Sequence, residues 1–301
     1  MTPLLEISKL ALPVEKLPES SVAVLNDDSG RVLARETIVK FGNSQAYLVL
    51  QDLHSSIANK DLLVKNEDLL HLKLVKIETQ KENRRLLPLA QQFHSLPDAR
   101  PAHCHLSDLL AEHSLGRFNL ELKKNVTIDS FLLDDSWRDD AGFIVTDRNV
   151  FYHYTFNTAS LLKSLIPSSE KIVAYTKADF EAVADFDNSV CGFSRDAFLE
   201  VLLANKNVLI AKSTDSVNGM IAGSGEQVNL IYAETIEIAH ALLKAYIQKN
   251  NLKNVKLFAP TGVWEAKPLE ARQVYRRHTR AVPSSLKWPK IYALNMGSHI
   301  V

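Results

Sequence analysis

The stretch that decides the fold is Asp187-Asn-Ser-Val-Cys-Gly192-Phe-Ser-Arg195-Asp-Ala-Phe198-Leu199. Apolar runs of two kinds follow it. Some are short and continuous, as in buried strands, and others repeat every three to four residues, as in helices. From these periods we expect, after an opening strand at 171–175, elements at residues 207–212, 219–223, 227–233, 235–250, 255–259, 274–281 and 290–294.

Helix starts can be located from capping residues. Thr176 precedes Asp179 by three residues, the spacing of a capping box, so a short helix is predicted to begin there. Ser194 is a favourable N-cap for a second helix that buries Phe198. The predicted order is therefore one strand, two helices, three strands, a helix, a strand, a variable helix and two strands, which indicates an α/β domain.

This order, together with Asp187, Gly192 and Arg195, resembles the C-terminal acetyltransferase-like domain of tandem GNAT proteins, which are acyl-CoA N-acyltransferases. The resemblance implies an α/β fold of two tandem GNAT-like domains, with mixed, mainly antiparallel sheets flanked by helices. Residues 1–157 would form a divergent GNAT-like domain, and residues 170–301 the C-terminal one. It also implies an N-acetyltransferase that transfers an acyl group from acetyl-CoA, or another acyl-CoA, to a small-molecule or peptide amine.

The first half of the sequence contains fewer patterns that predict secondary structure. A hairpin is expected from strands at 21–25 and 31–38, with a third strand at 45–50. Helical spacing predicts helices at 61–77, 86–94 and 106–115, and two strands are expected around the turn at 147–149. The alternative is that this half is not GNAT-like and forms a separate regulatory domain.

The loop that binds the pyrophosphate of coenzyme A in GNAT domains is missing. That loop has a Gln/Arg-x-x-Gly-x-Gly/Ala pattern at the start of a helix, where backbone N–H groups and the helix dipole hold the phosphates. The corresponding turn here is Ala233-Glu-Thr-Ile-Glu237, with two acids and no glycine. The alternative function is therefore a catalytically inactive GNAT-fold protein that binds a partner or a second copy of itself, and no cofactor-binding residue is assigned.

Arg195 has two interpretations. In the first it binds a carboxylate or phosphate of the substrate through its guanidinium. In the second it forms a buried ion pair with Asp187 that fixes the loop between two helices, and this interpretation is favoured.

The strand at 274–281 carries a basic row. Tyr275 and Arg277 share one face, while Arg276, His278 and Arg280 share the other. Arg277 is a candidate for binding an acidic substrate, and Tyr275 a candidate for protonating a departing thiolate, as GNAT tyrosines do. The favoured interpretation of the row is the solvated face of an edge strand.

Metal binding is not predicted. His103-Cys104-His105 would point in alternate directions on a strand, and no second pair has zinc-site spacing. An acidic run around Trp137 lacks a calcium-loop pattern, so it is interpreted as a solvated loop. Its acids are Asp129, Asp134, Asp135, Asp139 and Asp140.

The composition of the chain bears on whether it binds nucleic acid, enters a membrane or is secreted. The 35 basic and 35 acidic residues balance, which gives no support for nucleic-acid or membrane-surface binding. No apolar run approaches a membrane span, and Glu6 and Lys9 interrupt what a signal peptide would need. Two cysteines cannot build a disulfide framework, so a cytoplasmic protein is expected.

Overall fold

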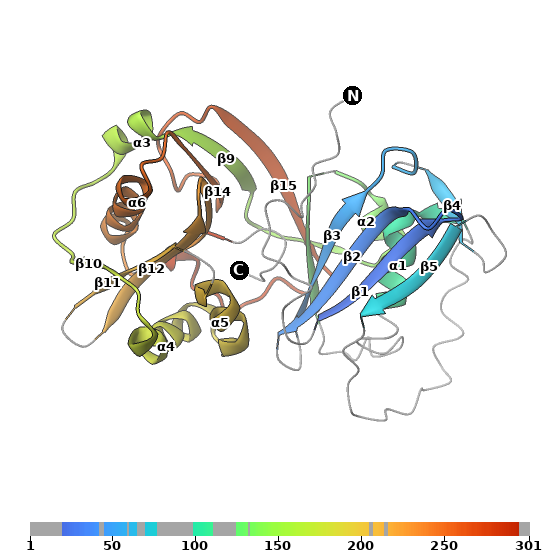
Figure 1. Ribbon diagram of the computed structural model, residues 1–301, viewed down its shortest axis with the longest axis horizontal. Coiled ribbons are helices and arrows are strands. Elements are labelled where there is room, and N and C mark those ends of the chain that lie inside the picture. Colours follow the sequence, from blue (N-terminus) through green and yellow to red (C-terminus); the bar gives the residue numbers. More distant parts are fainter. Residues whose placement is uncertain are drawn as a thin grey trace. The chain divides into compact units, whose positions relative to one another are not determined.

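A computed structural model gives the fold. It describes residues 20–41, 45–58, 60–64, 70–76, 99–110, 125–131, 133–204, 207–213 and 216–294. The described residues form two compact units (Figure 1). Unit 1 contains residues up to 147 and residues 276–282, and unit 2 contains residues 148–275 and the described residues from 283 onward. One strand, β15, therefore begins in unit 2 and ends in unit 1.

Unit 1 is a mixed sheet. Its strands lie in the order β5, β1, β2, β3, β7, the end of β15, and β8. The strands β3 and β7 run parallel, and β4 and β6 form a separate antiparallel pair. Its elements are β1 (Ser20–Asp27), β2 (Val32–Phe41), β3 (Gln45–Leu53), β4 (Asp61–Leu63), β5 (Leu70–Lys76), β6 (Ala99–Pro101), α1 (Ala102–Leu110), β7 (Asn125–Ser130), α2 (Ser136–Asp139) and β8 (Val145–Thr146).

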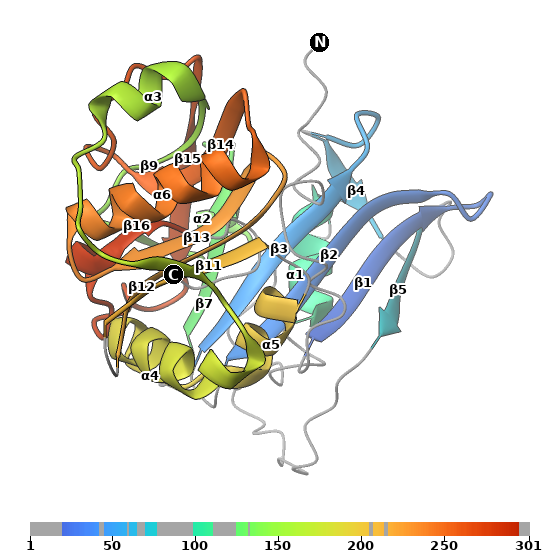
Figure 2. The same cartoon turned by 60° about the vertical axis from the view of Figure 1, so that its left-hand side comes forward.

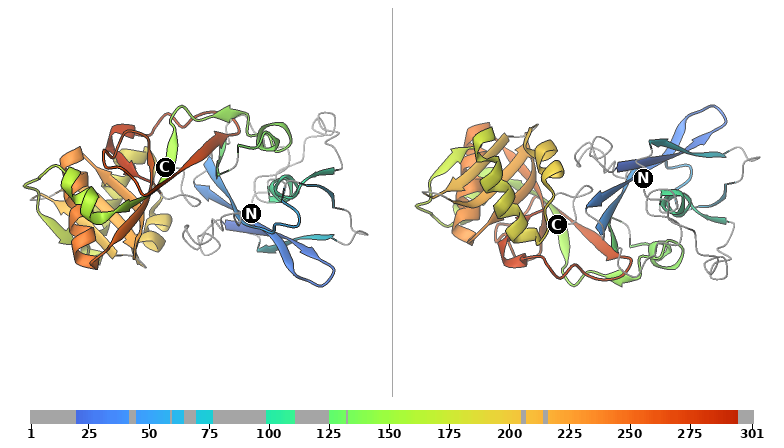
Figure 3. Two further views of the ribbon diagram at one scale, coloured as in Figure 1. Left: turned by 90° about the horizontal axis from the view of Figure 1, so that it is seen from above. Right: turned by 90° about the horizontal axis from the view of Figure 1, so that it is seen from below.

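The two faces of this sheet differ in polarity. Side chains alternate along a strand, so Ala46 and Leu48 of β3 face the apolar core, which includes Leu106 and Leu110 of α1. Figure 3 shows α1 lying along one face of these strands. Tyr47 points to the opposite face, where buried polar side chains of neighbouring strands gather. That face carries the polar network described below.

Unit 2 is also a mixed sheet. The order is β10, β11, β12, β13, β14, β9 and β15, and β13 and β14 are parallel. Its elements are β9 (Phe151–Asn157), α3 (Thr158–Ser164), β10 (Ile172–Ala174), η5 (Lys177–Asp179), α4 (Phe180–Cys191), α5 (Asp196–Ala204), β11 (Asn207–Lys212), β12 (Val217–Ser224), β13 (Gln227–Ala233), α6 (Ile236–Asn250), β14 (Asn254–Pro260), β15 (Glu270–His278), η6 (Trp288–Lys290) and β16 (Ile291–Ala293).

Helices cover both faces of the unit 2 sheet (Figure 2). The helix α6 begins at Ile236 and is capped by Thr235, whose Oγ1 accepts the Ile238 N–H. It packs on the core of the sheet through its apolar side. On the other face, Arg195, just before α5, contacts Tyr232 of β13. The predicted capping box of Thr176 and Asp179 is present. The α/β class with mixed sheets flanked by helices is confirmed.

Several predicted elements are corrected. Residues 61–63 and 70–76 are strands, because leucines at every second position from Leu70 to Leu74 suit a strand better than a helix. His103–His105 lie on α1 and not on a strand. The strands β8 and β9 form no hairpin: β8 pairs with β15, and β9 pairs with β14 and β15. The helix predicted at 86–94 lies outside the described residues.

Close packing of α6 on β12 depends on a glycine. A Cβ atom at Gly223 would lie 2.6 Å from the Gln227 carbonyl oxygen and 2.6 Å from the Tyr246 hydroxyl. Gly223→Ala is therefore expected to lower the free energy of unfolding by about 1–3 kcal/mol, through overpacking. Urea denaturation measures the change, with the exposed neighbour Ser224→Ala as control. Equal stabilities of the two variants would contradict this packing.

Candidate functional site

A slot opens between the parallel strands β13 and β14. The two strands pair only at Gln227 and Lys256 and then diverge. Diverging parallel strands leave unpaired backbone groups on both inner edges, and ligands of α/β sheets commonly bind where strands part at their carboxyl ends. The same end of β13 leads directly into α6, so slot and helix start are neighbouring parts of one region.

The strand β16 fills this slot. It pairs antiparallel with β13, with Ala293 opposite Ile231 and Ile291 opposite Tyr232. On its other side, Leu294 bridges Phe258 of β14 and donates its N–H to the Phe258 carbonyl at 2.8 Å. Residues 291–294 are all buried. The chain itself therefore pairs with both strands where they diverge.

Side chains of the protein also form hydrogen bonds and an ion pair at the start of α6. The Lys290 Nζ atom lies 2.7 Å from the Glu234 carboxylate in the turn before the helix. A hydrogen bond from Thr235 lowers the pKa of Glu237 in the first turn. Thr235 also caps the helix, and no glycine lies between Gly225 and the end of the helix at Asn250. This terminus therefore carries carboxylates where an anion-binding site needs free donors.

Arg195 lies in a closed cluster. Its Nε donates to Asp187 at 2.6 Å, a second, shorter contact joins Nη2 to the same carboxylate, and Nη2 also donates to the Tyr232 hydroxyl at 3.2 Å. Both charged side chains are 1% exposed, and the guanidinium stands 5.0 Å from the ring centroid of Phe198. Burial acts to lower the pKa of Arg195, but Asp187 outweighs it and the pKa is raised.

The predicted buried ion pair of Arg195 and Asp187 is therefore present. Gly192 ends α4 with φ +80°, a conformation that favours glycine, and a Cβ there would lie 2.5 Å from Ser285. The Asp187, Gly192 and Arg195 pattern thus has a local structural explanation. Binding of a substrate by Arg195 stays a prediction.

The basic row on β15 is not the solvated face of an edge strand. Arg276 and His278 are buried, and within unit 1 this end of β15 lies between β7 and β8. On the other face, Tyr275 is half-buried, and Arg277 is buried with its Nη2 3.8 Å from the exposed Asp135. Their roles in substrate binding and catalysis stay predictions.

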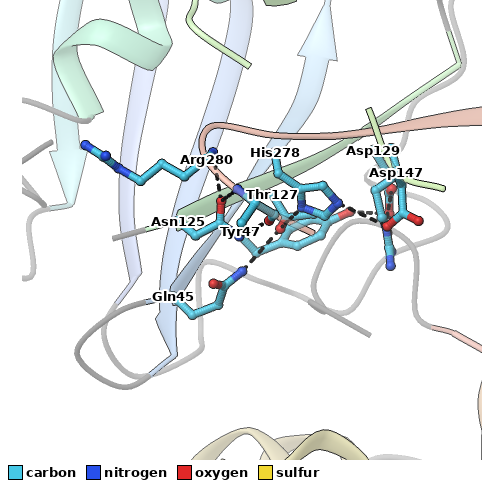
Figure 4. A network of polar contacts seen from close by, with 10 residues as sticks. Gln45, Tyr47, Asn125, Thr127, Asp129, Asp147, His278 and Arg280 are labelled. Carbon is cyan, nitrogen blue, oxygen red and sulfur yellow. Dashed lines mark hydrogen bonds and ion pairs between the residues drawn. The ribbon is translucent and has the colours of Figure 1, made fainter. Parts of the chain in front are cut away.

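His278 and Asp129 belong to a polar network in unit 1 (Figure 4), in which Arg276 pairs with Asp129. The Arg276 guanidinium forms two hydrogen bonds of 2.8 Å with Asp129, and the Tyr47 hydroxyl donates to the same carboxylate. Burial acts to lower the pKa of Arg276, but Asp129 outweighs it and the pKa is raised. This half of the network joins β3, β7 and β15.

The second half of the network is centred on His278. Its Nδ1 lies 2.8 Å from the Thr127 hydroxyl, and its Nε2 lies 3.0 Å from Asp147. A hydroxyl, an imidazole and a carboxylate in this order could form an activated nucleophile. Thr127 and His278 have no exposed surface, however, so no substrate can reach the hydroxyl. We interpret the network as a structural tie.

Sequence reasoning missed most of this network. The prediction that Asp129 lies in a solvated loop is wrong, because the residue is 4% exposed and paired with Arg276. The available signal was alternation: Thr127 and Asp129 flank Ile128 on one strand, and two polar side chains on one face need buried partners when that face is covered. Both partners lie on β15. Arg276 is 147 residues from Asp129, and His278 is 151 residues from Thr127.

The two histidines of the His103-Cys104-His105 motif contact other groups of the protein. His103 Nε2 lies 2.9 Å from the Ser136 hydroxyl and its ring packs on Trp137, while His105 contacts the Leu62 carbonyl at 2.7 Å. Burial lowers the pKa of His103 to about 4, so the ring is neutral at pH 7. Within the described ranges, no group of three potential ligands could hold a metal.

The chain is similar to a family model in sequence and to known proteins in structure. Residues 4–145 match a family model described as a domain of unknown function (DUF7596), and no curated protein matches the chain. A putative acetyltransferase from Pyrococcus horikoshii superposes with a TM-score of 0.56 at 12% identity, covering 89% of this chain and 76% of that one. The chain has the GNAT fold.

Two other GNAT structures are similar at a lower level. A GCN5-related N-acetyltransferase from Sphaerobacter thermophilus gives a TM-score of 0.48 at 12% identity, covering 89% of this chain and 84% of that one. A tandem GNAT protein from the clavulanic acid biosynthesis pathway gives 0.44 at 10% identity, covering 91% and 93%. No helix in the described part of this GNAT-fold chain is long and apolar enough to cross a membrane.

The residues of unit 2 do not fit the acyl-CoA that the GNAT fold implies. The resemblance places the pyrophosphate at the start of α6, where Glu234 and Glu237 stand and the glycine loop is missing. Next to this helix start, β16 pairs with β13 and Leu294 bridges Phe258 of β14, so the chain itself occupies the place where the two strands part.

Unit 1 contains a buried acid that makes stability depend on pH. The Glu36 carboxylate of β2 has no exposed surface and accepts the Ser107 hydroxyl at 3.1 and 3.2 Å. Burial raises the pKa of Glu36 well above its ordinary value, although Ser107 acts in the opposite direction. The folded state therefore keeps a proton that the unfolded chain releases, and stability falls as pH rises between the two pKa values.

Glu36→Gln is expected to remove this dependence. Above the ordinary pKa of glutamate, the single group should cost about 1.4 kcal/mol per pH unit until the folded pKa is reached. Urea unfolding of both proteins between pH 5 and pH 8 measures the difference, with the exposed Glu200→Gln as control. A stability that falls with rising pH as steeply in Glu36→Gln as in the parent protein would contradict the assignment.

Proposed function

We propose that this chain is a tandem GNAT-fold protein that works by binding a partner, and that its unit 2 does not transfer acyl groups from acetyl-CoA. The observation that carries the proposal is the occupied slot: β16 pairs with β13 and bridges β14 where the strands diverge. Residues 148–275 and 283–294 correspond in this proposal to the C-terminal GNAT-like domain, and unit 1 to the divergent one.

Two features of the start of α6 oppose the binding of a pyrophosphate: its carboxylates and its missing donor loop. Their free-energy costs can be compared. Two carboxylates near a helix N-terminus each disfavour an incoming anion by about 0.5 kcal/mol, which weakens binding only several-fold. Each charge-assisted hydrogen bond that the missing loop cannot donate is worth roughly 1.5–3 kcal/mol. The missing donor loop therefore counts for more than the added charge, and the inserted strand adds a steric obstacle.

The second candidate is an N-acyltransferase that uses acetyl-CoA or another acyl-CoA and a small-molecule or peptide amine. The similarity of fold to the Pyrococcus horikoshii protein favours it. In that candidate Arg195 and Arg277 would bind the substrate, and Tyr275 would be the catalytic acid.

Calorimetric titration of the full chain with acetyl-CoA and with desulfo-CoA tests the proposal. We expect no saturable heat with either compound. An active N-acetyltransferase titrated in the same buffer serves as positive control. Saturable binding at micromolar concentration that survives Arg277→Ala and is lost on Thr235→Pro would contradict the proposal, because the ligand would then be using the start of α6.

A further inference from the structure

The slot of unit 2 has the properties of a site for a peptide strand. Its walls are the inner edges of β13 and β14, which offer backbone groups on both sides. Its floor is the main apolar core of unit 2, to which Tyr292 and Ala293 contribute. Edge backbone groups give affinity for an extended peptide, and pockets for alternate side chains give selectivity.

We propose that this slot is a strand-binding site whose occupant is the chain's own C-terminal segment, residues 288–294. The proposal rests on the proposed function, because a slot that held acyl-CoA would have to release this segment. The recognised chemistry is a short apolar strand that runs antiparallel to β13 and has a small residue at the position of Ala293, which has no exposed surface.

Three polar contacts fix the register of the segment. Lys290 forms an ion pair of 2.7 Å with Glu234 at the entry of the slot. Next along the chain, the Tyr292 carbonyl accepts the Trp264 indole N–H at 3.0 Å. Finally, Leu294 donates to Phe258. A shift by one residue would turn the buried side chains to the opposite face, so this register is specific.

Residues 285–287, which form a strap on α4, lead into the segment. The Ser285 hydroxyl donates to the Cys191 carbonyl at 2.8 Å, and the Lys287 N–H donates to the Val190 carbonyl at 2.9 Å. The strap therefore rests on the C-terminal end of α4, directly over Gly192, where a Cβ would overlap Ser285. Between the strap and β15, Ser284 is exposed, which makes this point accessible for cleavage.

The test cuts the folded chain at that point. A recognition sequence for a site-specific protease is inserted between Pro283 and Ser284, and the full chain is purified and then cleaved. We expect the C-terminal fragment to stay bound in size-exclusion chromatography. A fluorescent peptide of residues 286–294 should exchange with it saturably, whereas the same peptide with Ala293→Asp should not.

Each outcome has a defined meaning. A fragment that separates at once, while the remaining chain keeps its Tm and binds neither peptide nor acetyl-CoA, would overturn the inference alone. Release of the fragment by acetyl-CoA would overturn both the inference and the proposed function. Retention, with exchange of the matched peptide only, supports the strand-binding site.

A measurement on the uncut chain covers the case in which the cleaved protein does not stay folded. Ala293→Asp should lower Tm by roughly 5–15 °C, because it places a carboxylate in the core of the slot. The matched control is Ala271→Asp, an exposed alanine on another strand of unit 2, for which we expect little change. Equal Tm values for the two variants would overturn the inference.

Discussion

Replacing Arg276 with alanine is expected to lower the free energy of unfolding by about 3–5 kcal/mol, the usual cost of leaving a buried charge without its partner. Asp129 has no exposed side-chain surface and receives both of its 2.8 Å hydrogen bonds from this guanidinium. The Tyr47 hydroxyl would still donate to it, but the carboxylate would lose its cationic partner. Urea denaturation followed by circular dichroism measures the loss.

A matched surface pair provides the control. Arg138 bonds Asp139 at 2.7 and 2.9 Å, but these side chains are 45% and 58% exposed. Arg138→Ala should therefore cost about 0–1 kcal/mol. The double variant Arg276→Met with Asp129→Leu should recover most of the loss, because it removes both charges. A single variant Arg276→Ala that is as stable as Arg138→Ala would contradict the structural role of the network.

Replacing Arg195 with alanine is expected to have a similarly large effect in unit 2. Asp187 would keep its charge at 1% exposure and lose both bonds to the guanidinium, and Tyr232 would lose its hydrogen bond. The expected loss is about 3–5 kcal/mol. Arg195→Lys should recover only part of it, because an ammonium group cannot form the paired contact.

This result would also separate the two interpretations of Arg195. A structural residue gives a lower Tm and a lower urea midpoint when it is removed. A substrate-binding residue leaves both almost unchanged and weakens ligand binding instead. An unchanged Tm for Arg195→Ala would therefore contradict the buried-tie interpretation.

The fold of the second half could be predicted because its signals are local. The capping box of Thr176 and Asp179 lies where the structure begins a helical segment, the helix predicted at 235–250 is observed at 236–250, and the strand 227–233 has its predicted bounds. In the first half, residues 70–76 carried both helical and alternating spacing. Local pattern alone could not choose between them, and pairing with β1 decides for a strand.

The site was harder to predict because its contacts are not local. Arg195 and Asp187 are eight residues apart, so their pairing could be inferred. Asp129 and Arg276 are 147 residues apart, and no spacing in a single sequence links them. The occupied slot was missed for the same reason: residues 290–294 read as a final strand, but the sequence does not show that they insert between β13 and β14.

Hydrogen–deuterium exchange of the full chain, with and without acetyl-CoA, tests the central claim most directly. The account predicts slow exchange across residues 291–294, because Leu294 bonds Phe258 and these residues are buried. It also predicts that millimolar acetyl-CoA changes neither this segment nor residues 233–240. Rapid exchange of residues 291–294, or faster exchange there when acetyl-CoA is added, would contradict a slot held by the chain itself.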